Sequence, residues 1–289
     1  MKAVFAFLAF LFFASNVFAN NEPATKDDIK LLIGQMLNNA PNPLLHIADV
    51  SGSALFQGDC LDIMPLIPDN SIDMVLCDLP YEVTQNKDDI MIDPKILWKQ
   101  YWRITKPNAP IVLFGQDKFT AVMMLSDKNH KYNLIWDKVL TSGFLNANRM
   151  PLRNHEDIMV FYRKQPIYNP QKVKGKPNHS KGKPKQTANN NYGAFDFVDN
   201  KELLGDMKHP KSILTFEKIH PSIAKHRTEK PIDLLKWLIN TFTNEEMIIL
   251  DNTMGSGTTC LAAKELNRKF IGIEKEPKYY EIAKQRIFN

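Results

Sequence analysis

The sequence predicts an α/β fold in which helices cover both faces of a doubly wound and mostly parallel sheet. Short apolar runs alternate with longer helical stretches, and a glycine loop stands between one such run and a helix. The chain has 289 residues, 44% of them hydrophobic, which suits one large domain with an insert and a sizeable core.

The first half of the predicted domain follows a connector at residues 20–50, which contains one short helical segment and the breaker run NNAPNP. Beyond the connector, short apolar runs predict strands, and longer stretches with apolar residues at helical spacing predict helices. In chain order we expect strands at 54–56 and 73–77, a helix at 95–105, a strand at 109–115, a helix at 119–125, and strands at 132–136 and 156–162.

The second half resumes after a long polar break. Residues 232–242 predict a helix, because their large apolar side chains share one face: Leu234, Leu235, Leu238, Ile239 and Phe242. The remaining elements are expected as a strand at 247–250, a helix at 258–267, a strand at 270–273 and a closing helix at 280–287.

The long polar break is basic. No acid occurs between Asp157 and Asp196, and the positive charge of the chain, +5 overall, is concentrated there. A solvated loop and an insert that contacts phosphate groups are both compatible with this pattern. In the second interpretation, the residues that bind a nucleic acid are Lys172, Lys174, Lys176, Lys181, Lys183 and Lys185.

The three cysteines, Cys60, Cys77 and Cys260, are isolated and odd in number. They form no CxxC or Cys/His cluster, so the sequence predicts no metal centre and argues against a zinc-dependent base deaminase. A disulfide framework is equally unexpected, which indicates a domain built for a reducing compartment.

The glycine loop at residues 255–257, GSG, lies between a predicted strand and a predicted helix. Glycines let the backbone approach a ligand closely, and a helix N-terminus offers free N–H groups to an anionic group. Glu274 ends the next predicted strand about 20 residues later, where it can accept hydrogen bonds from ribose hydroxyls. The loop lacks a P-loop or a full GxGxxG pattern, so a small carboxylate-bearing nucleoside such as S-adenosylmethionine fits better than a pyrophosphate.

Asp59, in FQGDC, ends the first predicted strand at the edge where ligands gather in open α/β sheets. Its carboxylate can accept a hydrogen bond from an adenine amino group. It can also cap the helix that begins at Leu61, and the two roles do not exclude each other.

A further acid, Asp78, follows the next strand and begins the tetrapeptide Asp78-Leu79-Pro80-Tyr81. The exocyclic amino group of a base is a poor nucleophile, because its lone pair is delocalised into the ring. Two acceptors that hold its N–H bonds favour tetrahedral geometry and expose the lone pair to an electrophilic methyl group. Asp78 supplies one acceptor and the carbonyl of Leu79 or Pro80 the other, while the proline fixes the backbone. Tyr81 offers a flat face to a base turned out of a duplex.

Taken in order, these motifs resemble the beta class of amino-group DNA methyltransferases, in which the catalytic strand precedes the cofactor loop. The resemblance covers residues 54–287 and rests on FQGDC, DLPY, HRTEKP at 226–231 and DNTMGSGTT at 251–259. In that family the tetrapeptide is usually Asp-Pro-Pro-Tyr and the glycine loop usually begins Asp-Pro-Phe. This chain therefore departs at Leu79 and at residues 252–253, while the acid, the second proline, the aromatic residue and the glycines remain.

The resemblance implies a circularly permuted S-adenosylmethionine-dependent methyltransferase fold. Residues 51–163 and 223–289 would form the methyltransferase domain, and residues 164–222 a basic target-recognition insert. The catalytic residues that it implies are Asp78, Pro80 and Tyr81. The cofactor contacts that it implies are Asp59, Cys60, Asp78, Lys230, Asp251, Gly255, Ser256, Gly257, Thr258 and Glu274.

The expected substrate is double-stranded DNA, and the aspartate that begins DLPY favours adenine N6 over cytosine N4 as the acceptor. Residues 136–156 resemble a loop that closes near the target base, although the sequence assigns no role within it. His155 and Glu156 fit a structural pair better than an acid–base pair. A cognate restriction enzyme and a homodimer are further expectations from the family.

Three other functions stay open. Protein-glutamine methyltransferases hold an amide nitrogen in a similar way, but their glycine loop precedes the tetrapeptide and an asparagine replaces the aspartate. A non-catalytic DNA-binding relative is suggested by the departures from the family motifs. An exported protein is suggested by residues 1–19, where a lysine, an apolar run and VFA have the pattern of a secretory leader. A mis-called start or a gene fusion would also explain this leader, and we expect a cytoplasmic protein because DNA and the cofactor are found there.

Overall fold

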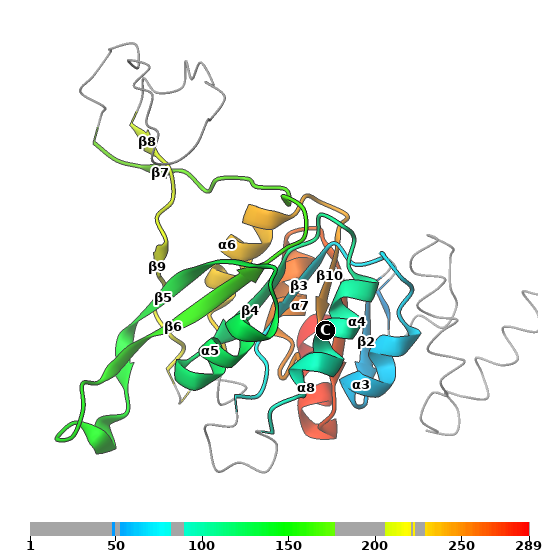
Figure 1. Ribbon diagram of the computed structural model, residues 1–289, viewed down its shortest axis with the longest axis horizontal. Coiled ribbons are helices and arrows are strands. Elements are labelled where there is room, and N and C mark those ends of the chain that lie inside the picture. Colours follow the sequence, from blue (N-terminus) through cyan, green and yellow to red (C-terminus); the bar gives the residue numbers. More distant parts are fainter. Residues whose placement is uncertain are drawn as a thin grey trace, which may run out of the picture. The chain divides into compact units, whose positions relative to one another are not determined.

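The computed structural model describes residues 48–49, 53–81, 90–176, 206–220, 222 and 229–288 (Figure 1). The leader and most of the connector lie outside the described residues, as do His226 and three of the lysines assigned to DNA binding: Lys181, Lys183 and Lys185. The chain divides into two compact units, of which the second is Pro170–Lys211. Within the described ranges, no helix is long and apolar enough to cross a membrane.

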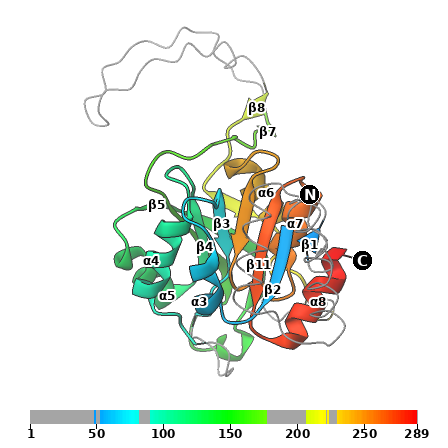
Figure 2. The same cartoon turned by 90° about the vertical axis from the view of Figure 1, so that its right-hand side faces the viewer.

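The first unit is built on a nine-stranded sheet with the order β1-β2-β11-β10-β3-β4-β6-β5-β9 (Figures 1 and 2). Strands β2, β11, β10, β3 and β4 run parallel, and β6 and β5 continue the sheet in antiparallel pairing. This arrangement confirms the predicted fold class. The strands are β1 Ala48–Asp49, β2 Ser53–Gln57, β3 Met74–Cys77, β4 Ile111–Gly115, β5 His130–Ser142, β6 Arg153–Phe161, β9 Ile213–Thr215, β10 Ile248–Asp251 and β11 Lys269–Glu274.

Helices cover both faces of this sheet and bury two apolar clusters. Helices α3, α4 and α5 contribute to one cluster, with Trp98 and Tyr101 of α4 among its largest side chains. Helices α6, α7 and α8 contribute to the other, which includes the predicted apolar face of α6. The helices are α3 Cys60–Ile63, the 3-10 helix η1 Met64–Leu66, α4 Pro94–Ile104, α5 Asp117–Ser126, α6 Ile232–Phe242, α7 Thr258–Glu265 and α8 Pro277–Phe288.

The carboxyl ends of the parallel strands meet at one edge of the sheet, which is where ligands bind in folds of this kind. Asp59 follows β2, Asp78 follows β3, and Glu274 ends β11. Strand β6 reaches beyond this edge, because Gly115, the last residue of β4, pairs with Asp157, which lies four residues after the start of β6. Residues 153–156 of β6, and the part of β5 that pairs with them, therefore project past the carboxyl edge as a hairpin.

Two parts of the sheet differ from the sequence-based expectation. β5 runs for 13 residues, beyond the strand expected at 132–136, and its pairing with β6 is irregular between Asp137 and Ser142. β9 was not expected as a strand and pairs in parallel with β5. Both features depend on the partner strand rather than on local periodicity, so the sequence pattern alone does not reveal them.

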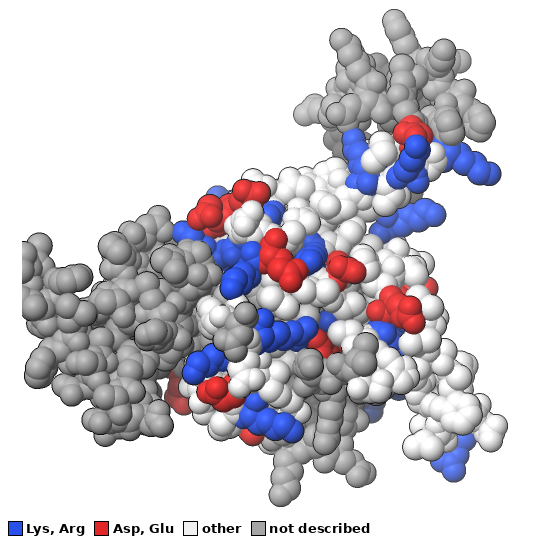
Figure 3. Space-filling model, turned by 180° about the vertical axis from the view of Figure 1, so that it is seen from behind, with Lys and Arg blue, Asp and Glu red and all other residues white. Residues whose placement is uncertain are grey.

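The second unit contains, among its described residues, an antiparallel ladder of β7 Val173–Lys174 and β8 Met207–Lys208. Figure 3 shows basic side chains on this unit, and Lys174 forms an ion pair with Asp206 at 3.6 Å. The unit is shorter than the insert expected at 164–222, since residues 164–169 and β9 fold with the first unit. A role in target recognition stays a prediction.

Candidate active site

Asp78 stands at the carboxyl edge because the four residues before it, MVLC, form a strand that is buried along its whole length. Both oxygens of its carboxylate are held. The hydroxyl of Tyr81 donates a hydrogen bond to Oδ1, and the ammonium of Lys230 lies 2.5 Å from Oδ2. Burial raises the pKa of the Asp78 carboxyl, although the charge of Lys230 opposes this shift. The predicted catalytic acid is therefore positioned by two side chains, of which Lys230 had been expected to contact the cofactor.

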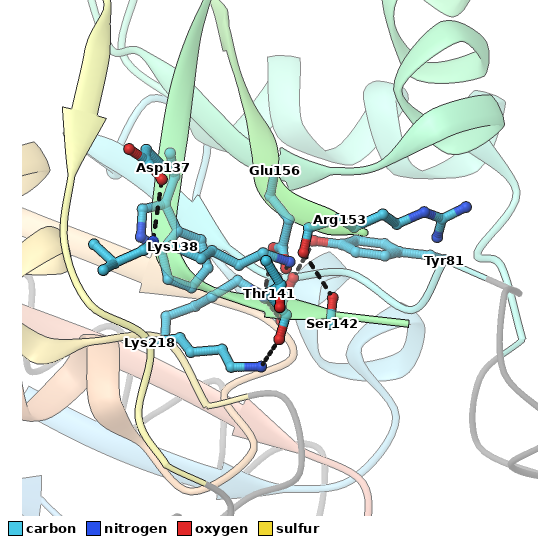
Figure 4. Close-up of polar contacts among 12 residues, drawn as sticks. Tyr81, Asp137, Lys138, Thr141, Ser142, Arg153, Glu156 and Lys218 are labelled. Atoms are coloured by element: carbon cyan, nitrogen blue, oxygen red, sulfur yellow. Dashed lines mark hydrogen bonds and ion pairs between the residues drawn. The ribbon is translucent and has the colours of Figure 1, made fainter. Parts of the chain in front are cut away.

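Lys230 also joins Asp78 to a second acid. Its ammonium lies 3.3 Å from Oε2 of Glu156, and the other oxygen of Glu156 is 3.1 Å from the ammonium of Lys138 (Figure 4). Both lysines are buried. Burial acts to raise the pKa of Glu156, but the two lysines outweigh it and lower that pKa. The four side chains form a line of alternating charge: Asp78, Lys230, Glu156, Lys138.

The carboxyl groups of Asp78 and Glu156 shift in opposite directions for a simple reason. Glu156 has two ammonium groups beside it and Asp78 has one. The pKa of Lys230 is raised, because the two carboxylates outweigh the effect of burial on its ammonium. Lys230 therefore stays protonated and neutralises part of the charge of both acids.

Aromatic rings surround this line of charges. The ammonium of Lys230 lies 5.0 Å from the ring centre of Phe114 and 5.8 Å from that of Tyr81. The ring of Tyr81 in turn packs against Phe119, with ring centres 4.7 Å apart. Stacking of a target base on Tyr81 stays a prediction, and this packing fixes the plane that the ring presents.

The glycine loop uses backbone conformations that favour glycine. Gly255 and Gly257 adopt left-handed conformations with φ of 52° and 77°. The N–H of Gly255 donates a hydrogen bond of 2.8 Å to Glu274, which also accepts from the N–H of Glu276 at 2.7 Å. Glu274, which was expected to bind a ribose, therefore stabilises the glycine loop. Burial raises its pKa.

The loop residues that depart from the family pattern connect it to the rest of the site. The hydroxyl of Thr253 donates a hydrogen bond of 3.0 Å to the main-chain carbonyl of Asp78. The side-chain oxygen of Asn252 accepts a hydrogen bond of 2.6 Å from the buried hydroxyl of Tyr101. The glycine loop and the tetrapeptide that begins at Asp78 are thus joined directly. Asp251, at the start of the loop, is buried, which raises its pKa to about 7.

Ser256 and Thr258, two of the expected cofactor contacts, are tied to the last helix. Their hydroxyl groups lie 3.2 and 3.0 Å from the guanidinium of Arg286. Arg286 also forms an ion pair of 2.6 Å with Glu229, the neighbour of Lys230. The HRTEKP segment and the glycine loop are therefore linked through α8.

Asp59 caps α3, as one of the two interpretations of the sequence expected. Its carboxylate accepts a hydrogen bond of 2.9 Å from the N–H of Leu61 and pairs with Lys275 at 3.1 Å. The thiol of Cys60 is buried, which raises its pKa to about 11. Contacts of either residue with a cofactor stay predictions, as do the DNA contacts of the three described lysines of the insert: Lys172, Lys174 and Lys176.

Sequence reasoning assigned no role to Lys138 and did not place Glu156 beside Asp78. A signal for Lys138 exists, because it follows Leu134 and Trp136 at alternate positions of β5, and all three side chains are buried. A lysine in such a row has to find buried partners. His155 and Glu156 do not form a pair, since neighbouring residues of a strand face opposite sides and His155 is exposed.

Comparisons with known proteins show which family the chain resembles. Residues 72–285 match a family model described as DNA methylase, of the N6/N4 type. The chain is 28% identical over 262 residues to the type II methyltransferase M.BglII of Bacillus subtilis, and the match covers 80% of this chain and 68% of that protein.

Two solved structures share the fold. The M1.HpyAVI–SAM complex has 23% sequence identity and a TM-score of 0.56, and the match covers 81% of this chain and 98% of that one. The cytosine-N4-specific PvuII DNA methyltransferase has 16% identity and a TM-score of 0.60, with coverage of 82% and 86%.

Proposed function

The chain belongs to the DNA methylase family of the N6/N4 type, and on that basis we propose that it transfers a methyl group from S-adenosylmethionine to the exocyclic amino group of a base in double-stranded DNA. We propose adenine N6 as the acceptor, since the aspartate that begins DLPY favours adenine. Cytosine N4 is the alternative, and the PvuII relative acts on that atom.

One contact carries the proposal, the hydrogen bond of 3.0 Å from the Thr253 hydroxyl to the carbonyl of Asp78. Methyl transfer requires the attacking nitrogen to lie within about 3–3.5 Å of the methyl carbon. The peptide that holds the nitrogen and the loop that holds the methyl donor must therefore keep a fixed separation. This bond joins the two segments, which are far apart in the sequence.

The residues at the carboxyl edge suit S-adenosylmethionine. The left-handed Gly255 and Gly257 let the main chain approach a ligand, and the carboxylates of Asp59 and Glu274 stand near neighbouring strand ends. Carboxylates in these places can accept hydrogen bonds from the amino and hydroxyl groups of a nucleoside. When bound, this cofactor supplies an electrophilic methyl group.

The side chains around Asp78 would act on the target amino group. Asp78 accepts one N–H bond and the carbonyl of Leu79 or Pro80 accepts the other. Each oxygen of Asp78 already accepts one hydrogen bond, from Tyr81 or Lys230, and retains a second lone pair for the substrate. The nitrogen would form its new bond to the methyl carbon as the carbon–sulfur bond of the cofactor breaks and leaves a neutral thioether, and the nitrogen would then release one proton to water. Lys230 and Glu156 would keep the Asp78 carboxylate oriented while the methyl group is transferred.

Further parts of the proposal follow from the sequence. Lysines of the unit Pro170–Lys211 would contact DNA phosphates, and the reaction would take place in the cytoplasm. A protein-glutamine substrate is the weaker alternative, because the tetrapeptide here begins with Asp78 and precedes the glycine loop. A restriction-enzyme partner and a homodimer stay predictions.

The test is transfer of a labelled methyl group from S-adenosylmethionine to unmethylated DNA, followed by sequencing that detects the modified base. Asp78→Asn should lower the rate at least about a hundredfold, the size of effect seen when one polar group of a preorganised site is removed. The matched control is Asp73→Asn, in the residue just before β3, where Asp73 pairs with Lys106 at 2.7 Å. This control should keep most of the activity.

Three outcomes would change the proposal. Methylation of a protein and never of DNA would favour the glutamine alternative. Methylation at cytosine N4 would correct the acceptor. DNA binding without transfer, and without a rise in melting temperature on addition of S-adenosylmethionine, would favour a non-catalytic relative.

A further inference from the structure

The hairpin of β5 and β6 ends in an exposed apolar turn. The side chain of Phe144 is 80% exposed and that of Leu145 is 99% exposed, and Met150 follows on the same turn. Single exposed apolar residues are ordinary, whereas adjacent large ones at the end of a projection indicate a surface that meets a partner.

The turn is held by its own hydrogen bonds. It forms the 3-10 helix η2 Phe144–Asn146, which begins after Gly143, a left-handed residue with φ of 84°. The N–H of Asn146 donates to the carbonyl of Gly143 at 2.9 Å, and that of Ala147 to Phe144 at 3.0 Å. The two apolar side chains are therefore presented by a defined turn.

The base of the same hairpin belongs to the active site. Lys138 of β5 and Glu156 of β6 form the ion pairs that reach Asp78 through Lys230, and the carbonyl of Thr141 accepts a hydrogen bond of 3.1 Å from Lys218 (Figure 4). The hairpin projects past the carboxyl edge of the sheet, and its strand spans at most about 20 Å from Lys138 to the turn. A base held at Asp78 is still attached to its duplex, so a turn at this reach can meet that duplex.

The charge of the hairpin selects a polyanion as its partner. No acid occurs between Asp137 and Glu156, and Arg149 lies on the turn, whereas Arg153 at its base pairs with Asp117 of α5 at 2.6 Å. Figure 3 shows this projection as a mostly uncharged surface with a basic side chain near its end. An apolar turn that carries the cation Arg149 matches stacked bases flanked by phosphates.

We propose that Leu145, supported by Phe144, enters the base stack of the DNA substrate and fills the space that the target base leaves when it turns out of the duplex. This inference rests on the proposed function. Turning a base out breaks its pairing and stacking, and a side chain that occupies the gap keeps the base from returning. Apolar wedges of this kind separate base steps in DNA-bending proteins.

The test compares Leu145→Ala with the wild-type protein in single-turnover methylation of a duplex that carries the site found by sequencing. We expect the rate to fall about tenfold to a hundredfold, because the cost of unpairing is no longer offset. The matched control is Leu125→Ala, since Leu125 is 88% exposed near the end of α5, on another part of the unit. This control should leave the rate unchanged.

A second duplex separates the wedge from other roles. It carries an abasic position opposite the target base, which is then already unpaired. On this duplex the Leu145→Ala rate should come within about threefold of the wild-type rate. Melting temperatures of the variants should match that of the wild type, since both leucines are exposed.

Each contrary result has a distinct meaning. If wild-type protein methylates the paired duplex and Leu145→Ala does so equally well, the wedge is wrong. A defect that persists on the abasic duplex overturns it too, and loss of a wild-type dimer in sedimentation velocity would make the turn a subunit interface. If the wild-type protein methylates no DNA at all, the proposed function fails first.

Discussion

Replacing Lys230 by methionine removes the one ammonium that Asp78 and Glu156 share. The lysine side chain is 7% exposed, and the two carboxylates are 22% and 14% exposed, so solvent can replace little of the lost interaction. Removing one member of a buried ion pair costs about 3–5 kcal/mol of unfolding free energy. At about 2 °C for each kcal/mol in a chain of this size, the melting temperature should fall by about 6–10 °C.

The loss should depend on pH in a defined direction. Without Lys230 the pKa of Asp78, which burial already raises, rises further, and Glu156 loses one of the two ammonium groups that lower its pKa. The folded variant therefore favours the protonated forms of both acids more than the folded wild type does. Stability that comes from such a group is fully present below its unfolded pKa and is lost as the pH rises through its folded pKa. The difference between variant and wild type should therefore be largest near pH 8 and smaller near pH 5.

The assay is urea unfolding of both proteins at pH 8 and pH 5. The double variant Lys230→Met/Glu156→Gln should lose less unfolding free energy than the sum of the losses in the two single variants, because the double variant no longer contains the acid that Lys230→Met leaves without this partner. A loss below about 1 kcal/mol, or equal losses at both pH values, would refute the reasoning, since such values are typical of exposed ion pairs.

Two further predictions concern the glycine loop. Burial raises the pKa of Asp251 from 3.8 to about 7, so the stability from its protonated form is complete below about pH 4 and is lost as the pH rises through 7. Asp251→Asn should be more stable than wild type at pH 8, by up to about 4 kcal/mol, and similar near pH 4; urea unfolding that gives equal differences at both would contradict this. Gly257→Ala should cost about 1–3 kcal/mol more than Gly143→Ala, because both residues have positive φ but only at 257 would a Cβ lie 2.8 Å from Ala283. Equal urea midpoints for the two variants would contradict this and would mean that α8 shifts to accommodate the added methyl group.

The local parts of this protein could be predicted because their signals are contiguous. The apolar run of β3 stops at DLPY, and the run of β10 stops at the glycine loop, so both segments were expected at the carboxyl edge. The position of Gly255 and Gly257 between a strand and a helix follows from the same local pattern, while their left-handed conformations are seen in the structure. Strand β9, in contrast, is short and gains its structure from pairing with β5, and no local pattern indicated it.

The sequence by itself determined the fold class and the order of the motifs, because both depend on neighbouring residues or on repeating apolar spacing. The tertiary structure alone decided what surrounds Asp78: Lys230, Thr253 and the acid Glu156 come from strands and loops that are distant in sequence. The physical reason is that a buried charge must find its partner in space, and the chain's folding, rather than its local order, sets which partners are within reach.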